Sequence, residues 1–146
     1  MATALTSAQL SDELAKMFPN IKAWSFSDAT YAVVARGSVN ELGKFLARVL
    51  WGFRVMGWQT YFDCDDYARL AHVLACIMHR KARASNKGPD AEAPAFGQVW
   101  YISAAAGGHA VNWVRTEQGI ELWEPQTQQF IGATDAERKS AWQLFA

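Results

Sequence analysis

A polar stretch at residues 82–94, ARASNKGPDAEAP, divides the chain into two parts with different hydrophobic patterns. Before it, apolar residues recur at helical spacing, whereas after it, segments rich in Val, Ile, Trp and Tyr alternate with glycine-containing breaks. Helices followed by strands favour an α+β fold, in which N-terminal helices pack on a C-terminal antiparallel sheet. We expect one domain over residues 1–146, helical over about 1–81 and stranded over about 95–130.

Local signals place the individual elements of this fold. Four segments carry a capping-box pattern, which is typical of a helix start: Thr6–Gln9, Ser38–Glu41, Asp63–Asp66 and Thr134–Glu137. We expect the second helix to stop at Gly57 and the third to run for about 17 residues through Arg80. Three strands are expected at residues 95–104, 109–117 and 119–126, and residues 30–35 are either a short strand or an extended link.

Composition and charge exclude several classes of protein. The 146 residues are 51% hydrophobic and 19% charged, which indicates a globular chain rather than a disordered one. A formal net charge of zero gives no reason to expect nucleic acid or an acidic membrane surface as a partner. We see neither a signal peptide nor an apolar run long enough to span a bilayer, so we expect a soluble, cytoplasmic protein.

Three residues form a candidate catalytic constellation. Cys64 falls in the first turn of the third expected helix, where free N–H groups and the helix dipole favour a thiolate. Strand alternation places His109 and Glu124 on sides with apolar neighbours, on two adjacent strands. A buried carboxylate needs a partner, so we expect Glu124 to orient His109 and His109 to act as base for Cys64.

The order and local sequence of these residues resemble papain-like and transglutaminase-like cysteine enzymes. Three stretches, DCDDYA (63–68), GHAVNWV (108–114) and WEPQT (123–127), look like the peptidase domain of the Marasmius oreades agglutinin family and phage-encoded relatives. The resemblance covers roughly residues 58–128. It departs from the transglutaminase-type pattern in having Glu124 for Asp and Val111 where Trp is frequent. By this resemblance the fold has a papain-like core, and Cys64, His109 and Glu124 are the triad.

The resemblance implies an enzyme, a cysteine peptidase or amidase that cleaves a peptide or isopeptide bond. The Cys64 thiolate attacks the amide carbonyl, His109 protonates the leaving amine, and water releases the acyl-enzyme. A peptide or protein is then the substrate, with no nucleic acid or membrane partner. Two alternatives stay open: a phage-type peptidoglycan amide hydrolase, and a non-catalytic binding or inhibitory module on the same fold.

Further residues near the triad have two interpretations each. Gln59 is a donor to the oxyanion or a turn residue, and Asn112 and Gln126 are the rivals of Glu124 for orienting His109. Three tryptophans either wall a substrate groove or fill the core, and core packing is expected for at least two of them: Trp58, Trp113 and Trp123.

The aspartates around Cys64 oppose a thiolate, because charge of the same sign raises its free energy. Asp65 and Asp66 either only cap the helix or also bind a divalent cation, which would remove the conflict. The family resemblance implies calcium as that cation, and no cofactor is needed for the chemistry itself. Cys64 and Cys76 lie about 18 Å apart on one expected helix, too far for a disulfide.

Overall fold

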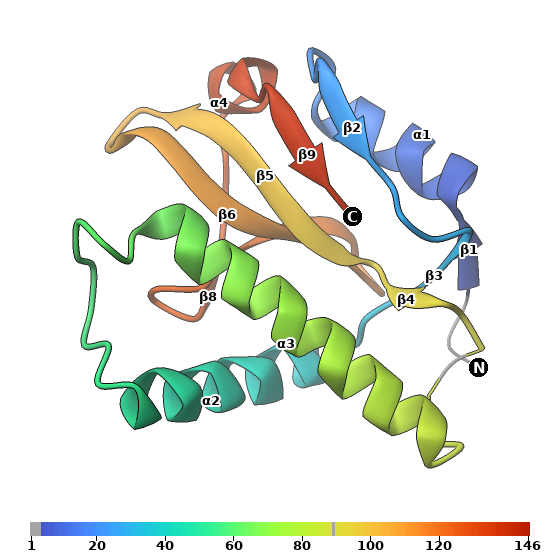
Figure 1. The fold of residues 1–146 in the computed structure, drawn as a ribbon. Helices are drawn as coiled ribbons and strands as arrows, with labels where there is room; N and C mark the ends of the chain where they lie inside the picture. The colour runs from blue at the N-terminus through green and yellow to red at the C-terminus, as the bar shows by residue number, and fades with distance from the viewer. Residues whose placement is uncertain (1–3, 89) are drawn as a thin grey trace.

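The computed structural model of the chain describes residues 4–88 and 90–146 (Figure 1). Within these residues nine strands form two sheets, accompanied by four helices. The helices are α1 (Ser7–Met17), α2 (Arg36–Gly52), α3 (Cys64–Ala84) and α4 (Asp135–Ser140). The strands are β1 (Ala4–Thr6), β2 (Ala23–Ser25), β3 (Thr30–Ala32), β4 (Ala93–Pro94), β5 (Phe96–Ser103), β6 (Gly107–Thr116), β7 (Gly119–Glu124), β8 (Gln129–Ile131) and β9 (Gln143–Phe145).

The larger sheet has the strand order β2-β9-β5-β6-β7-β8. Its centre is the antiparallel set β5, β6 and β7, which confirms the three strands predicted from the apolar segments. Gly97, in β5, lies opposite Trp113 in β6, and Asn112 lies opposite Trp123 in β7. The smaller sheet has the order β1-β3-β4.

The predicted fold class, in which N-terminal helices pack on a C-terminal antiparallel sheet, is wrong. The N-terminal part supplies strands to both sheets, and two pairings are parallel, β2 with β9 and β3 with β4. These strands have two or three residues each, too few to show an alternating pattern. They form because partners far away in the sequence complete their hydrogen bonds, as Ala146 N–H does with the Ser25 carbonyl.

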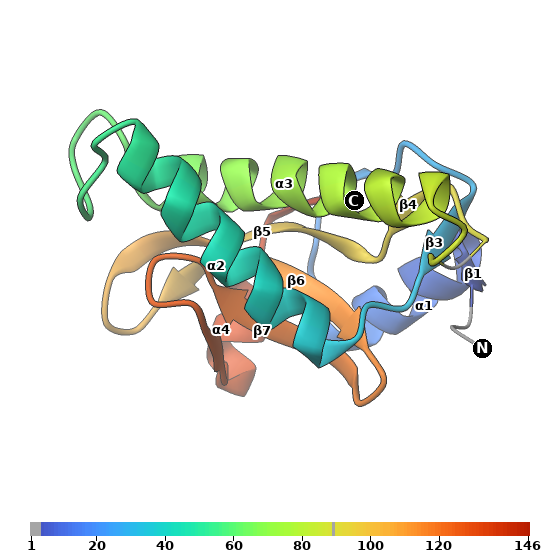
Figure 2. The same ribbon diagram turned by 90° about the horizontal axis from the view of Figure 1, so that it is seen from below.

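Two hydrophobic cores lie on opposite faces of the larger sheet (Figure 2). The first includes Leu10 and Leu14 of α1 with Trp113 of β6. The second joins α2 and α3 to the other face, where Trp123 is fully buried. Alternation along β6 and β7 sends neighbouring residues into different cores, so the sheet is hydrophobic on both faces.

The helix starts confirm three of the four capping predictions. α1 and α4 follow Thr6 and Thr134, whose side chains accept a backbone N–H three residues ahead, and α3 begins after Asp63. The second prediction is wrong, since α2 begins at Arg36 after Ala35, before the expected Ser38 box. It also ends at Gly52 rather than Gly57, which leaves a connection over residues 53–63.

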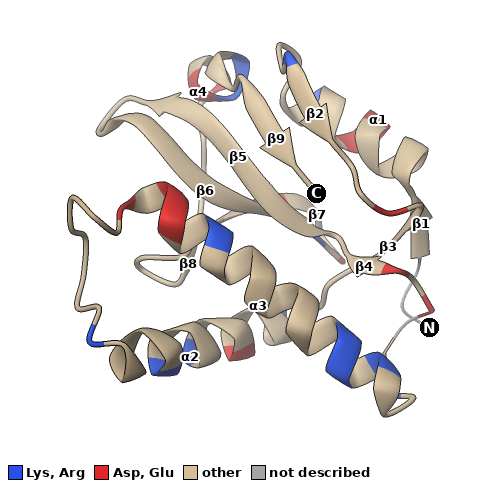
Figure 3. Cartoon of the chain, in the orientation of Figure 1, with Lys and Arg blue, Asp and Glu red and all other residues tan. Residues whose placement is uncertain are grey.

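Charge along α3 complements its dipole. Acidic side chains lie in its first turn and basic ones in its last, as Figure 3 shows. The helix has 21 residues, four more than predicted. None of the helices in the described part of the chain has both the length and the hydrophobicity needed to cross a membrane.

Candidate functional site

The imidazole of His109 and the carboxylate of Glu124 are held in direct contact. His109 Nε2 lies 2.6 Å from Glu124 Oε2, and both side chains are largely buried. Glu124 Oε1 accepts the backbone N–H of Gln126 at 3.0 Å, so both carboxylate oxygens are occupied. The His109 ring also meets the edge of Tyr101, with ring centroids 5.9 Å apart. Since Nε2 faces Glu124, only Nδ1 of this ring is left for another partner.

Cys64 reaches the same end of the sheet from the start of α3. β6 begins at Gly107, but its pairing with β7 starts only at Asn112, so the first residues of β6 extend past β7. The backbone N–H of Ala110, the residue after His109, lies close enough to the Cys64 thiol to lower its pKa. The structure thus brings Cys64 against the strand that carries His109, while Glu124 approaches from β7.

Burial raises the pKa of the Cys64 thiol, and the negative charges of Asp63 and Asp65 raise it further. Hydrogen bonds from the backbone N–H groups of Ala110 and Asp65 oppose this shift but do not outweigh it. The Cys64 thiol therefore stays protonated at neutral pH unless a base or a cation acts on it.

Burial also raises the pKa of Tyr101, to about 12, with Glu137 and Glu124 adding to the effect.

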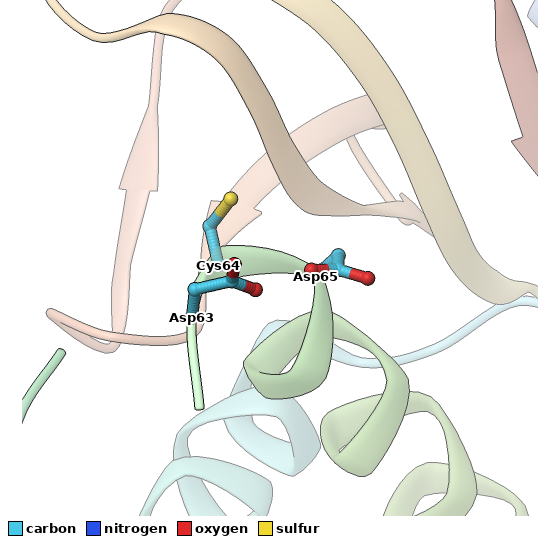
Figure 4. A group of neighbouring side chains, drawn as sticks. All are labelled: Asp63, Cys64 and Asp65. Atoms are coloured by element: carbon cyan, nitrogen blue, oxygen red, sulfur yellow. The ribbon is translucent and has the colours of Figure 1, made fainter. Parts of the chain in front are cut away.

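Asp63 and Asp65 lie together beside Cys64 (Figure 4). One oxygen from each carboxylate and the Cys64 sulfur are all within 4.8 Å of one another. A hydrogen bond between the two carboxyl groups raises the pKa of Asp65, with burial as the next cause. Asp63 Oδ1 is buried and has no hydrogen-bond partner in the described part of the chain.

Asp66 has the capping role that was predicted for it. Its carboxylate accepts the backbone N–H of Asp63 at 3.4 Å, and Arg69 pairs with Asp66 at 3.2 Å and with Asp65 at 2.5 Å. The structure therefore groups Asp63, rather than Asp66, with Asp65. Sequence reasoning assigned Asp63 only to the helix cap, although its position beside Cys64 was a signal for a second role.

The remaining predicted polar residues lie apart from the His109 ring. Asn112 is fully buried and donates to the carbonyls of Ala68 and Gly97, both at 2.9 Å. Gln59 is exposed, and its backbone pairs with Phe62. Within the described residues no side-chain hydrogen bond links Gln59 to Cys64. Its assignment as an oxyanion donor stays a prediction.

The three tryptophans divide between surface and core. Trp113 and Trp123 have no exposed surface, so they fill the two cores and do not reach solvent as the wall of a groove must. Trp58 is 61% exposed and belongs to a cluster that sequence reasoning missed. We call this cluster the aromatic loop: Trp51, Phe53, Met56, Trp58 and Tyr61, all exposed, just before Cys64. The sequence feature that could have revealed this cluster is the presence of five large apolar side chains within eleven residues, spaced with neither a helical nor an alternating period.

Comparison with known proteins gives matches to solved structures only. No family model and no curated protein sequence matches the chain. One similar structure is described as "PSL1a-E64 complex", with a TM-score of 0.72 and 20% identity. A second, with a TM-score of 0.70 and 20% identity, is Polyporus squamosus lectin bound to the epitope Neu5Acα2-6Galβ1-4GlcNAc. The chain has the fold of a lectin structure. Each match covers 98% of this chain but only 51% and 49% of the other, so the chain spans about half their length.

These matches contradict the predicted family and fold. They are described as a lectin, not as papain-like or transglutaminase-like cysteine peptidases, and no family model supports the peptidase domain that the three motifs resembled. The two-sheet architecture of this chain matches a solved structure with a TM-score of 0.72 and stands in place of the predicted papain-like core. Short motifs report local geometry at a few residues, whereas the fold match extends over nearly the whole chain.

The predictions of activity and partner are corrected by the same finding. The match to a lectin with a bound glycan contradicts three predictions: that the chain is a cysteine hydrolase, that it belongs to the peptidase or amidase class, and that its partner is a peptide or protein substrate. It contradicts equally the two alternatives, the phage-type peptidoglycan hydrolase and a binding or inhibitory module without sugar specificity.

Proposed function

We propose that this chain binds carbohydrate and that the aromatic loop faces the glycan. The observation that carries the proposal is the exposure of five large apolar side chains at the end of α2 and in the connection after it, from Trp51 to Tyr61. Exposed apolar patches of this kind are typical of binding surfaces. Tyr67 of α3 holds the end of the loop, since Phe62 packs edge-on against its ring with centroids 4.9 Å apart.

The side chains of the loop have the chemistry that sugars need. The face of an indole or phenol ring is electron-rich and attracts the C–H groups on one side of a pyranose ring. Trp58 and Tyr61, 61% and 94% exposed, offer such faces, and the exposed Gln59 amide between them can bond hydroxyl groups. Arg54, also exposed, would add an ion pair with an acidic sugar. The glycan of the Polyporus squamosus lectin structure contains such a sugar, Neu5Ac, and makes it the first ligand to test.

Calorimetry with Neu5Acα2-6Galβ1-4GlcNAc tests this proposal. We expect binding that weakens at least about tenfold in Trp58→Ala and Tyr61→Ala, since each removes a stacking surface. Ile77→Ala, which removes an exposed apolar side chain from α3, serves as the matched control and should bind normally. If a glycan panel that includes this ligand shows no binding, or if all three variants bind equally, the proposal is wrong.

A second candidate function is favoured by the geometry around Cys64. We propose that Cys64 is a reactive thiol for a small electrophilic ligand, with His109 as its base, Glu124 as the group that orients His109, and Gln59 as a donor to the bound ligand. The contacts of Cys64 with the Ala110 N–H and of His109 with Glu124 support this arrangement. One structure of similar fold is described as a complex with E64, which makes E64 a suitable probe.

Alkylation kinetics test the reactive thiol. Iodoacetamide replaces the thiol proton with a carboxamidomethyl group and releases iodide, and Cys76 is an internal control because burial raises the pKa of its thiol as well. We expect intact-mass and peptide analysis to show Cys64 modified about tenfold faster than Cys76. His109→Ala should remove most of that difference, Glu124→Gln should reduce it, and E64 should add to Cys64 alone. Equal rates at the two cysteines would exclude this function.

We also propose that the acidic first turn of α3 binds calcium. The unpartnered Asp63 Oδ1 and the adjacent Asp65 carboxyl group are hard oxygen donors, which calcium prefers, whereas the thiol is not. We propose Asp65, as predicted, and Asp63 in place of Asp66 as the ligands. A bound divalent cation would replace the hydrogen bond between the two carboxyl groups and offset the negative charge that Cys64 faces.

Thermal unfolding with and without calcium tests this assignment. Calcium at ten times its Kd should stabilise the protein by about 1.4 kcal/mol, and a chelator should reverse the effect. Asp63→Asn and Asp65→Asn should abolish the stabilisation, whereas Asp66→Asn should retain it because the Asp66 carboxylate lies outside the group that Asp63 and Asp65 form beside Cys64. A response lost in Asp66→Asn but kept in Asp63→Asn would restore the original pair. An unchanged Tm at millimolar calcium would mean that the aspartates only cap the helix.

A further inference from the structure

A cavity of about 270 Å³ lies at the far end of α3 from the candidate site. It is lined by the first turns of α2, the last turns of α3 and the segments around β3 and β4, and it is partly open to solvent. Ala82, which lines it, is 18 residues beyond Cys64, or about 27 Å along the helix. The cavity is therefore separate from Cys64 and from the aromatic loop.

The interior of this cavity is apolar. The larger side chains that line it are Val34, Val39, Leu42, Met78 and Phe96. Val39, Leu42 and Phe96 belong to the second core, so the cavity opens directly onto packed hydrophobic side chains. A water molecule occupies about 30 Å³ and a methylene group is of similar size, so the space holds a chain of about nine heavy atoms.

The ionisable groups that line the cavity are basic or neutral. They are Lys87 and His79, and no carboxylate lines it in the described part of the chain. No ion pair joins Lys87 to a carboxylate among the described residues, and His79 Nε2 is engaged by the Ala91 carbonyl at 3.0 Å. Ala35, the N-cap of α2, also lines the cavity, but the first N–H groups of that helix are engaged: Arg36 N–H donates to Glu117 at 3.3 Å, and Ser38 and Val39 donate to the Ala35 carbonyl. The ammonium group of Lys87 is therefore the group that favours an anion at this edge.

We propose that this cavity binds a medium-chain monocarboxylate. The alkyl chain lies among the apolar side chains, and the carboxylate lies at the edge with Lys87. The charge at the edge selects an anion over a cation or a neutral head group, and the volume selects a chain of about eight carbons over much longer ones. This site is independent of the carbohydrate and thiol functions proposed above.

A chain-length series with one head-group comparison tests this site by calorimetry. From hexanoate to octanoate, each added methylene should tighten binding about fourfold, and the gain should stop near ten carbons when the space is full. Octanoate should bind at least about tenfold more tightly than octylammonium, which has the same chain and the opposite charge. No measurable octanoate binding, or equal binding of the two, would overturn the proposal.

Two pairs of variants locate the site. Ala82→Leu fills the cavity and should abolish octanoate binding, whereas Ala84→Leu, exposed on the same helix, should leave it unchanged. Lys87→Gln should reduce the preference for octanoate over octylammonium at least about threefold, and Lys81→Gln should not. Thermal unfolding shows whether each variant is folded, and a folded Ala82→Leu protein that binds octanoate normally would refute the assignment. If octanol binds as tightly as octanoate, the cavity is an apolar site without anion selectivity, and the proposal is wrong.

Discussion

Gly97→Ala is expected to cause the largest loss of stability of any glycine-to-alanine change in this chain. A Cβ at this position would lie 2.0 Å from the Phe145 carbonyl oxygen and 2.6 Å from the Trp113 ring. Neither neighbour can move freely, because β9 is paired with β5 on one side and β2 on the other, and Trp113 is fully buried. Overpacking of this severity costs about 3 kcal/mol or more.

Chemical denaturation measures this effect against a matched control. Gly37→Ala adds the same methyl group in α2, where no atom lies within 4 Å of the new Cβ. Because alanine favours a helix, that variant should be stabilised by about 0.5–1 kcal/mol. A Gly97→Ala protein as stable as Gly37→Ala would show that β9 does not lie against Gly97.

Replacing Asn112 by alanine is expected to destabilise the fold by about 3 kcal/mol. Its amide donates both to the carbonyl of Ala68 in α3 and to that of Gly97 in β5, so one side chain ties the helix to the sheet. Each lost hydrogen bond costs about 1 kcal/mol, and the cavity left at this fully buried position adds to the loss.

The matched control for this variant is Asn40→Ala, an exposed asparagine on α2 that should change stability by less than about 0.5 kcal/mol. Asn112→Ala should also leave the ratio of Cys64 to Cys76 alkylation intact in the folded protein, because Glu124 contacts His109 and Asn112 does not. If that ratio falls to the level seen in His109→Ala, Asn112 has the orienting role instead.

Local sequence was sufficient wherever neighbours in the chain decide the structure. The caps of α1 and α4 depend on contacts three residues apart, and the set β5, β6 and β7 has strands long enough for alternation to be visible. The same alternation placed His109 and Glu124 on the same face of adjacent strands, where their side chains meet at 2.6 Å. The N-terminal dipole and acidic cap likewise placed Cys64 at the start of α3.

The predictions were wrong where a residue far away in the sequence decides the structure, and where the inference rested on short motifs. Ser38 has a good capping pattern, but α2 begins at Arg36, whose backbone N–H is met by Glu117 from the turn after β6. Motifs at 63–68, 108–114 and 123–127 indicated a peptidase family, yet the fold over 98% of the chain matches a lectin. A few residues constrain the geometry of one site, whereas the topology depends on every pairing in the sheet.

The helices with local caps, the central strands and the residues at their ends follow from the amino-acid sequence. The pairing of β2 with β9, some 120 residues apart, and the grouping of Asp63 rather than Asp66 with Asp65 arise only when the chain folds. The tertiary structure also decides that the aromatic loop is exposed while Trp113 and Trp123 are buried. The physical reason is range: capping and alternation act over two to four residues, whereas short strands and side-chain burial depend on which distant surfaces exclude water.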